Sequence, residues 1–310
     1  MYFLCAASAA HFLFLERTDI KMKTKTKTKQ ILSVLLALLM LFGVLPATVF
    51  AAEKTNPLDY LTYEIADGEV TITDCDTSIS GELTIPETIE DYPVTGIGDS
   101  AFMECTGLTN IVIPNSVTSI GLTAFSYCTD LTSIIIPDSV INIGLFAFDS
   151  CSKLSEIKLS NNLTNIGNSA FSDTAYYNND LNWENDMLYI GKYLLNAKKD
   201  IAGSRTVKKG TKLIADAAFL SCKNLTDITI PNSVINIGEN AFNGCSGLKN
   251  LTIPNSVTSI GDFAFSNCTQ LTNVTVSDSV ISIGAFTFGY YTTDDFGIFK
   301  IPNFKIYCYA

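Results

Sequence analysis

The chain has 310 residues, with 20 basic and 31 acidic side chains and a formal net charge of −11 at pH 7. Phosphate groups and anionic lipid headgroups are bound chiefly through lysine and arginine patches, so this acid excess disfavours nucleic acids and membrane surfaces as partners. The only histidine is His11, which lies in a segment that we expect to be removed. A chain without imidazole cannot form a histidine-dependent catalytic triad or zinc site.

The first 51 residues are predicted to direct export rather than to fold. A lysine-rich stretch beginning at Met22 runs into an apolar stretch over 31–44, too short to span a bilayer, and then into small residues ending at Ala51. We expect residues 22–51 to be a signal peptide and residues 1–21 to be an upstream extension from a misplaced start. Cleavage removes six basic and two acidic residues. The mature chain then has 14 basic and 29 acidic residues, a net charge of −15. The mature chain is therefore expected to be exported, with no membrane insertion after cleavage.

Residues 52–96 are predicted to form an N-terminal cap and an irregular first coil. Two segments of alternating apolar and polar residues, 62–65 and 69–73, are joined through Asp67-Gly68. This dipeptide favours a tight hairpin, which would close one end of the fold.

The first coil carries extra residues. Pro86 and Pro114 are 28 positions apart, whereas later prolines at the same place in the repeat are 23 apart. We expect the five surplus residues, within 87–93, to bulge out as a loop.

A unit of 23 residues recurs over 97–289, and residues 108–130 (LTNIVIPNSVTSIGLTAFSYCTD) show it best. One phenylalanine and one cysteine return in most units: Phe102, Phe125, Phe148, Phe171, Phe219, Phe242, Phe265 and Phe288, and Cys105, Cys128, Cys151, Cys222, Cys245 and Cys268. A fixed period of this length is typical of a solenoid, in which each unit buries its apolar face against its neighbours.

Each unit can be interpreted as one coil. Alternation places Ile111 and Ile113 inward on a short strand that ends at Pro114. The chain is predicted to turn again at Gly121, a position that needs an unusual φ or no side chain. The Ala124-Phe125 segment that follows is too brief for a stable helix. Stacked coils should therefore form a parallel sheet along one face.

The repeat is diverged at 172–218, where Phe171 and Phe219 are 48 residues apart and one phenylalanine is missing. Segments 187–190 and 193–195 flank Gly191-Lys192 and predict a hairpin. After the last regular unit, residues 290–310 are expected to form a C-terminal cap, cut short as in a truncated chain.

Two groups of residues are candidates for a binding surface. Tyr176, Tyr177 and Trp183 lie in a polar, projecting stretch of the diverged coil, and aromatic side chains often carry binding energy. The alternative interpretation is that these rings cover the core where the repeat falters. The outward strand positions of the later coils are small and polar and offer hydrogen bonds to a ligand: Asp227, Thr229, Asn250 and Thr252.

The cysteine ladder has competing interpretations. An even number of cysteines in an exported chain favours disulfides, and neighbouring coils would bring bridges such as Cys105 to Cys128 within range. A cysteine that recurs at one inward position is more simply a small buried hydrophobe. A metal site is disfavoured because these thiols are strung along an axis.

The acidic residues of the diverged coil are interpreted as a solvated loop. Asp180, Glu184 and Asp186 could form a calcium loop or a carboxylate pair, but they lack the regular spacing of calcium loops and a partner acid placed by the pattern. A carboxylate-dependent glycosidase is therefore a distant alternative.

The motif IVIPNSVTSIGLTAFSYC resembles the BspA-type leucine-rich repeat of bacterial surface and secreted proteins. The resemblance covers the chain from about Tyr60 onward. It implies a right-handed leucine-rich-repeat superhelix, β-rich, with a parallel sheet on one face and short turns or helical segments elsewhere.

The resemblance also implies a function: protein binding or adhesion by a secreted or cell-surface protein. The expected partner is a protein or glycan on another cell or matrix, and no enzyme activity, catalytic residue, metal or cofactor is expected. The alternative function is a non-catalytic targeting subunit of an extracellular polysaccharide-degrading system.

Overall fold

The computed structural model describes residues 56–291, 298–299 and 305–309, within a compact unit formed by residues 54–310. The predicted signal peptide and upstream extension lie outside the described residues, as does most of the predicted C-terminal cap. Among the described residues, no helix is long and apolar enough to cross a membrane.

The N-terminal end begins with a 3₁₀ turn, η1 (Pro57–Asp59), followed by strands β1 (Leu61–Ala66) and β2 (Glu69–Cys75). The two strands pair antiparallel around Asp67 and Gly68, whose φ angles are 53° and 82°. The predicted hairpin is thus confirmed. β2 also pairs parallel with β5 (Tyr92–Ile97), so the hairpin covers the first coil.

The five surplus residues form a second small hairpin rather than an irregular loop. β4 (Thr88–Ile89) pairs antiparallel with β5 across Glu90 and Asp91, both in the left-handed region. Ile89 is buried, which is why this segment folds back instead of projecting freely.

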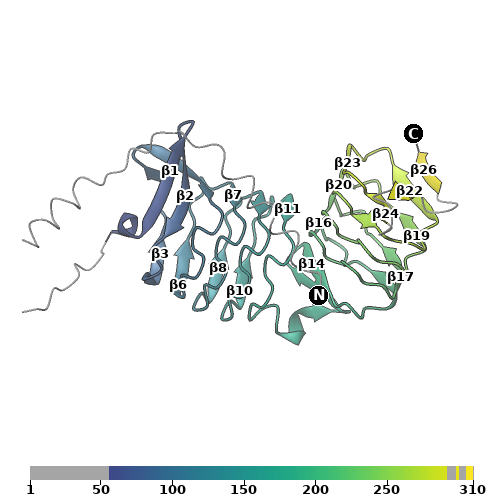
Figure 1. The fold of residues 1–310 in the computed structure, drawn as a ribbon, viewed down its shortest axis with the longest axis horizontal. Coiled ribbons are helices and arrows are strands. Elements are labelled where there is room, and N and C mark those ends of the chain that lie inside the picture. The colour runs from purple at the N-terminus through teal and green to yellow at the C-terminus, as the bar shows by residue number, and fades with distance from the viewer. Residues whose placement is uncertain (1–55, 292–297, 300–304, 310) are drawn as a thin grey trace, which may run out of the picture. The chain divides into compact units, whose positions relative to one another are not determined.

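The repeats stack as coils. The strand that precedes the repeated proline, or the residue in its place, lies in a first strand column. Its earlier members are β3 (Ser80–Thr84), β6 (Gly107–Val112), β8 (Ser133–Ile135) and β10 (Glu156–Lys158). Its later members are β15 (Gly203–Thr206), β17 (Leu225–Thr229), β19 (Asn250–Thr252), β22 (Asn273–Ser277) and β26 (Lys305–Tyr309). Paired strands are parallel and in register one coil apart, which confirms the predicted parallel sheet (Figure 1).

A second strand column runs beside the first, at the Ser-Ile position of the unit. Its members after β5 are β7 (Ser119–Ile120), β9 (Asn142–Ile143), β11 (Asn165–Ile166), β14 (Tyr193–Ala197), β16 (Leu213–Ile214), β18 (Asn236–Ile237), β20 (Ser259–Ile260) and β23 (Ser282–Ile283). The sequence analysis predicted only the first sheet. It missed this second one because most of its strands have only two residues, too few to show an alternation of apolar and polar side chains.

The third side of each coil, the turn column, contains no helix among the described residues. Thr123 and Tyr127 have φ angles of 51° and 61° on either side of Phe125. The N–H groups of these three residues donate to carbonyls of the next coil at 2.7–2.9 Å. The strand-like pair β21 (Phe265–Ser266) and β24 (Phe288–Tyr291) continues this side, and β25 (Ile298–Phe299) pairs antiparallel with β24.

The repeated phenylalanines form two stacks inside the coils. Rings from Phe102 to Phe171 lie 4.9–5.1 Å apart, and rings from Phe219 to Phe288 lie 4.7–5.6 Å apart, with interplanar angles of 8° or less. Two core clusters follow the same division. The diverged coil separates the two stacks, so the phenylalanines do not form one continuous spine.

The recurring glycine is required by space and not by φ. A Cβ at Gly121 would lie 2.6 Å from backbone atoms of Gly98 and Asp99 in the preceding coil, and Gly144 meets Gly121 in the same way. Neither residue has a positive φ. Of the two reasons that the sequence suggested, the missing side chain is the operative one.

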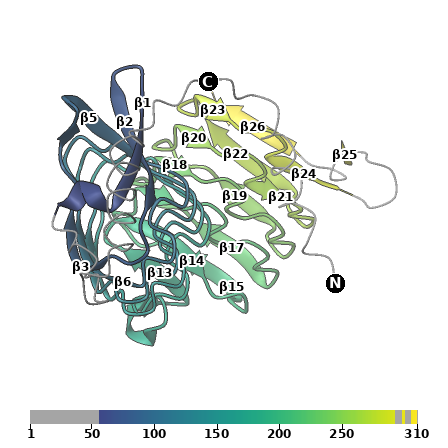
Figure 2. The ribbon, with the colours of Figure 1, turned by 60° about the vertical axis from the view of Figure 1, so that its left-hand side comes forward.

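The diverged coil holds the predicted hairpin, β13 (Met187–Ile190) and β14, joined through Gly191. The Ala197 N–H donates to the Ala218 carbonyl of the next coil. In a regular coil the phenylalanine makes this bond, as the Phe102 N–H does to the Ala124 carbonyl. Ala197 therefore occupies the position of the missing phenylalanine. Figure 2 shows the later strands from β15 to β26 in one row beyond this coil.

Candidate functional site

An open groove, here called the loop groove, lies where the diverged coil interrupts the turn column. Its volume is about 600 Å³. Residues from the preceding coil, the diverged coil and the following coil line it: Asn168, Ser169, Ser172, Tyr177, Asn178, Asp180, Trp183, Asn196, Ala197, Lys198, Lys199, Asp200, Ala217 and Leu220. Ala197, which stands where other coils carry phenylalanine, is one of these lining residues.

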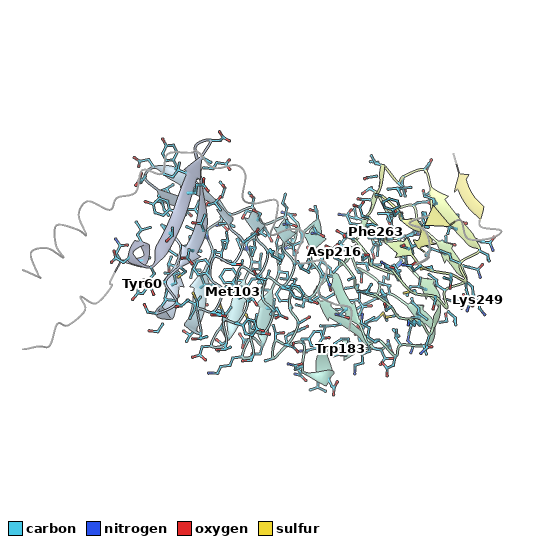
Figure 3. All side chains as sticks on the ribbon, in the orientation of Figure 1. Tyr60, Met103, Trp183, Asp216, Lys249 and Phe263 are labelled. Atoms are coloured by element: carbon cyan, nitrogen blue, oxygen red, sulfur yellow. The ribbon has the colours of Figure 1, made fainter. Side chains whose placement is uncertain are left out.

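Two of the three predicted aromatic residues line this groove. The rings of Tyr177 and Trp183 meet edge to face, with centroids 5.3 Å apart and planes at 81°. The Trp183 indole N–H donates to the Tyr177 carbonyl at 2.8 Å, and the Lys198 ammonium lies 5.4 Å from the Trp183 ring centre. Both side chains are half-buried, so each ring is held in place while part of it faces the groove. Figure 3 shows Trp183 at the outer edge of the diverged coil.

Tyr176 has a different place. Its hydroxyl donates to the Tyr189 carbonyl on β13 at 2.7 Å, and it is absent from the groove lining. Burial raises the pKa of the Tyr176 phenol. Tyr176 therefore braces the hairpin, as the covering interpretation of these rings predicted, whereas Tyr177 and Trp183 both cover the core and line the groove.

Three acidic residues of this coil are each paired with a basic residue that comes later in the chain. Asp180 pairs with Lys198, Glu184 with Lys208 and Asp186 with Arg205, at 3.0–3.2 Å; β12 (Trp183–Glu184) carries Glu184. Within the described part of the chain, no group of three or more His, Cys, Asp or Glu side chains could hold a metal ion. The arrangement is that of a solvated, charge-balanced loop.

A second groove, here called the sheet groove, lies over the outward face of β17, β19 and β22. Its volume is about 670 Å³. All four predicted sheet residues line it, together with residues beside them: Asp227, Ile228, Thr229, Ile230, Asn232, Asn250, Thr252, Ile253, Pro254, Asn255, Thr275 and Ser277. The structure thus brings the predicted sheet residues together in one place.

The sheet groove is a regular array of hydrogen-bonding groups. Asp227, Asn250 and Asn273 face each other across neighbouring strands, and the Asn273 amide donates to the Asn250 side-chain oxygen at 3.3 Å. Thr252 and Thr275, each two residues after these asparagines, also lie opposite each other on β19 and β22. Such an array can bind a polar ligand through many weak contacts, but it carries no aromatic anchor.

Several lining residues were not predicted from the sequence. Asn168 reaches the loop groove from one coil and Asn196 and Lys199 from the next, and only the fold brings them together. Asn232 and Asn255 had a signal in the sequence, because each follows the repeated proline of its unit.

The seven described cysteines of the core are free and buried. The Cys128, Cys151, Cys245 and Cys268 thiols donate to phenylalanine carbonyls of the preceding coil at 3.1–3.2 Å. Burial raises the pKa of Cys222 to about 11 and of Cys268 to about 12. Thiols held in this way are poor nucleophiles, consistent with the interpretation of the ladder as small buried hydrophobes.

The profile of the family described as BspA type leucine rich repeat region matches residues 76–202 and 204–308, in six copies. No curated protein matches the chain.

Several solved structures are similar to the chain. A T. pallidum leucine rich repeat protein is 24% identical, over 74% of this chain and 86% of that one, with a TM-score of 0.38. A leucine rich cell surface protein from Faecalibacterium prausnitzii is 22% identical, over 85% and 78%, with a TM-score of 0.35. The pneumococcal vaccine antigen PcpA is 15% identical, over 81% and 92%, with a TM-score of 0.29.

Proposed function

Because the chain belongs to the BspA-type leucine-rich repeat family, we propose that it is a secreted or cell-surface protein that binds a protein or glycan partner through the loop groove and the sheet groove. The family supports a protein-binding repeat. Export is supported by the lysine-rich and apolar pattern of residues 22–51.

The observation that carries the proposal is the fixed aromatic pair in the loop groove. Interface energy concentrates in tryptophan, tyrosine and arginine side chains that are already held in place, because little conformational freedom is lost on binding. Tyr177 and Trp183 meet this condition through their mutual contact and the 2.8 Å hydrogen bond of the indole. Lys198, Lys199, Asn178 and other polar residues surround them with hydrogen-bonding groups.

The sheet groove extends the proposed surface. Most of its lining side chains are polar, and the exposed ones are Thr229, Asn232, Asn250, Thr252 and Asn255. We expect these groups to contribute more to the specificity of binding than to its affinity. A non-catalytic role agrees with the ion pairs of Asp180, Glu184 and Asp186 and with the burial of the described thiols.

The test begins with a ligand found by probing arrays of glycans and of surface and matrix proteins with the labelled mature chain. Trp183→Ala and Tyr177→Ala should each weaken its binding at least about ten-fold, the loss expected for an aromatic anchor. Asp227→Ala and Asn250→Ala should weaken it by less. All variants must first melt like wild type.

If both aromatic variants bind unchanged while the sheet variants lose affinity, the aromatic pair is only a cover for the core. Recognition then belongs to the sheet groove alone.

A further inference from the structure

The first strand column is interrupted in the middle of the fold. β10 is the last strand of the earlier set and β15 is the first strand of the later set. β10 pairs only with β8 and β15 only with β17, so no strand of the diverged coil lies paired between them. β15 therefore has one edge paired with β17 and one edge without a strand.

The register shows which backbone groups lie on the open edge of β15. The Val207 N–H donates to the Thr229 carbonyl at 2.9 Å, and alternate residues of a strand point to opposite sides. Ser204 and Thr206 therefore direct their N–H and C=O groups away from β17. Farther along the same edge, the Lys208 N–H is accepted by the Tyr189 hydroxyl at 3.1 Å.

Two of these N–H groups are available. β15 pairs with no strand other than β17, and among the described residues the turn, loop and side-chain hydrogen bonds include none from the N–H of Ser204 or Thr206 and none to the Thr206 carbonyl. The Ser204 carbonyl receives a 3.2 Å contact from the Arg205 guanidinium. Ser204 and Thr206 are both exposed.

A hollow of about 340 Å³ lies beside this edge. It is lined by Asn185, Asp186, Met187, Ser204, Arg205 and Thr206. Asp186 and Arg205 form an ion pair at 3.2 Å at its margin. The open edge is therefore reached from solvent and has room alongside it.

We propose that this edge binds an extended polypeptide segment, which adds to β15 as a further strand. A row of N–H and C=O groups spaced two residues apart is complementary to another strand, and an accessible edge of this kind is a template for pairing. The inference deepens the proposed function, on which it rests, by naming the class of partner and its mode of binding. Specificity would come from the side chains at the hollow, Asn185 and the Asp186–Arg205 pair.

The test uses a capped synthetic peptide with the sequence of residues 271–276, LTNVTV, a strand of the same column. Its binding should slow amide hydrogen exchange at Ser204 and Thr206 at least about ten-fold near saturation, at peptide concentrations up to about 5 mM, because few backbone bonds form. Two N-methylated peptides serve as matched probes, one methylated at Thr272 and Val274 and the other at Asn273 and Thr275. A strand uses alternate N–H groups on each edge, so one peptide should bind like the parent and the other should not.

Two variants test the protein side. Thr206→Pro removes a donor that points away from β17, so β15 should stay paired with β17 while the peptide binds at least about ten-fold more weakly. Thr206→Val keeps the backbone N–H and should bind within about two-fold of wild type. Melting curves check that both variants fold.

Several outcomes overturn the proposal: no protection of Ser204 and Thr206, equal binding of both methylated peptides, or a loss with Thr206→Val as large as with Thr206→Pro. If Thr206→Pro fails to fold, the methylated pair decides alone. A failure of this test does not contradict the proposed role of the loop groove, because Trp183 and Tyr177 are tested with a different ligand and different variants.

Discussion

Asp216 is a partly buried carboxylate. It lies near the junction of the two sets of strands (Figure 3), where its carboxylate accepts the Glu239 N–H at 2.7 Å. Burial, with a contribution from the charge of Glu239, raises the pKa of Asp216 from 3.8 to about 6. The folded state thus disfavours the ionised form of this side chain.

Asp216→Asn is therefore expected to stabilise the protein at pH 7 and to leave it unchanged near pH 3.5. A raised folded-state pKa means that stability is retained below the unfolded pKa and is lost as the pH rises through about 6. The expected gain above pH 6.5 is about 1 to 3 kcal/mol, and asparagine keeps an acceptor for the Glu239 N–H.

Urea unfolding at pH 3.5, 5 and 7 measures this difference. Glu239→Gln is the control, because it removes the neighbouring charge but keeps the backbone donor, and it should give a smaller gain. A variant less stable than wild type at pH 7 would show that the hydrogen bonds of Asp216 outweigh the cost of burying its charge.

At the scale of one coil, the repeated phenylalanine is among the largest buried side chains, and it stacks on the phenylalanines of the coils beside it in every regular coil. Phe242 stacks on Phe219 at 4.7 Å and on Phe265 at 5.0 Å and is fully buried. Phe242→Ala should lower the free energy of unfolding by about 3 to 5 kcal/mol, as for other large buried truncations.

Phe146→Ala is the matched control for this substitution. Phe146 is 37% exposed in the turn column, so its truncation should change stability by less than about 1 kcal/mol. Chemical denaturation compares the two variants, and equal losses would contradict a buried stack as the source of the energy.

The elements that the sequence predicted well are those with a local signal. Asp67-Gly68 and Gly191-Lys192 each marked a hairpin, and both hairpins form. The second strand column was missed because strands such as Ser119–Ile120 are held by the neighbouring coil and not by their own pattern. The hairpin at Thr88–Ile89 was missed for a similar reason, since the burial of Ile89 decides it.

The candidate surfaces were predicted unevenly. The sheet residues from Asp227 to Thr252 follow from register alone, and they share one groove. The loop groove is lined by Asn168 and Lys198, which are thirty positions apart in a stretch where the repeat is broken. No periodic pattern could have paired these two residues.

At the scale of the molecule, charge is distributed very unevenly. Residues 55–152 carry 15 acidic and no basic side chains, whereas eight basic residues lie within 192–223. Like charges on the earlier coils repel one another, and salt screens this repulsion.

Raising NaCl from 0.05 to 0.5 M should therefore increase the melting temperature by about 2 to 4 °C, the shift expected for about 1 kcal/mol in a chain of this size. Hydrogen exchange should slow more over residues 61–150 than over 213–276. The triple variant Glu64→Gln, Glu82→Gln and Glu104→Gln, all at exposed positions, should reproduce part of the gain at low salt. An equal response in both regions would contradict a local charge effect.

The tight contact between Gly121 and the backbone at Gly98 and Asp99 also limits how such a chain can change in length. A shift of one residue within a coil would place a side chain where no methyl group fits, so small insertions survive only where they leave the stack, as the Thr88–Ile89 hairpin does. A duplication of 23 residues keeps every glycine against its neighbour. Gene lengths in this architecture should therefore grow or shrink by whole coils, and the number of coils between the two ends is free to drift without a new fold.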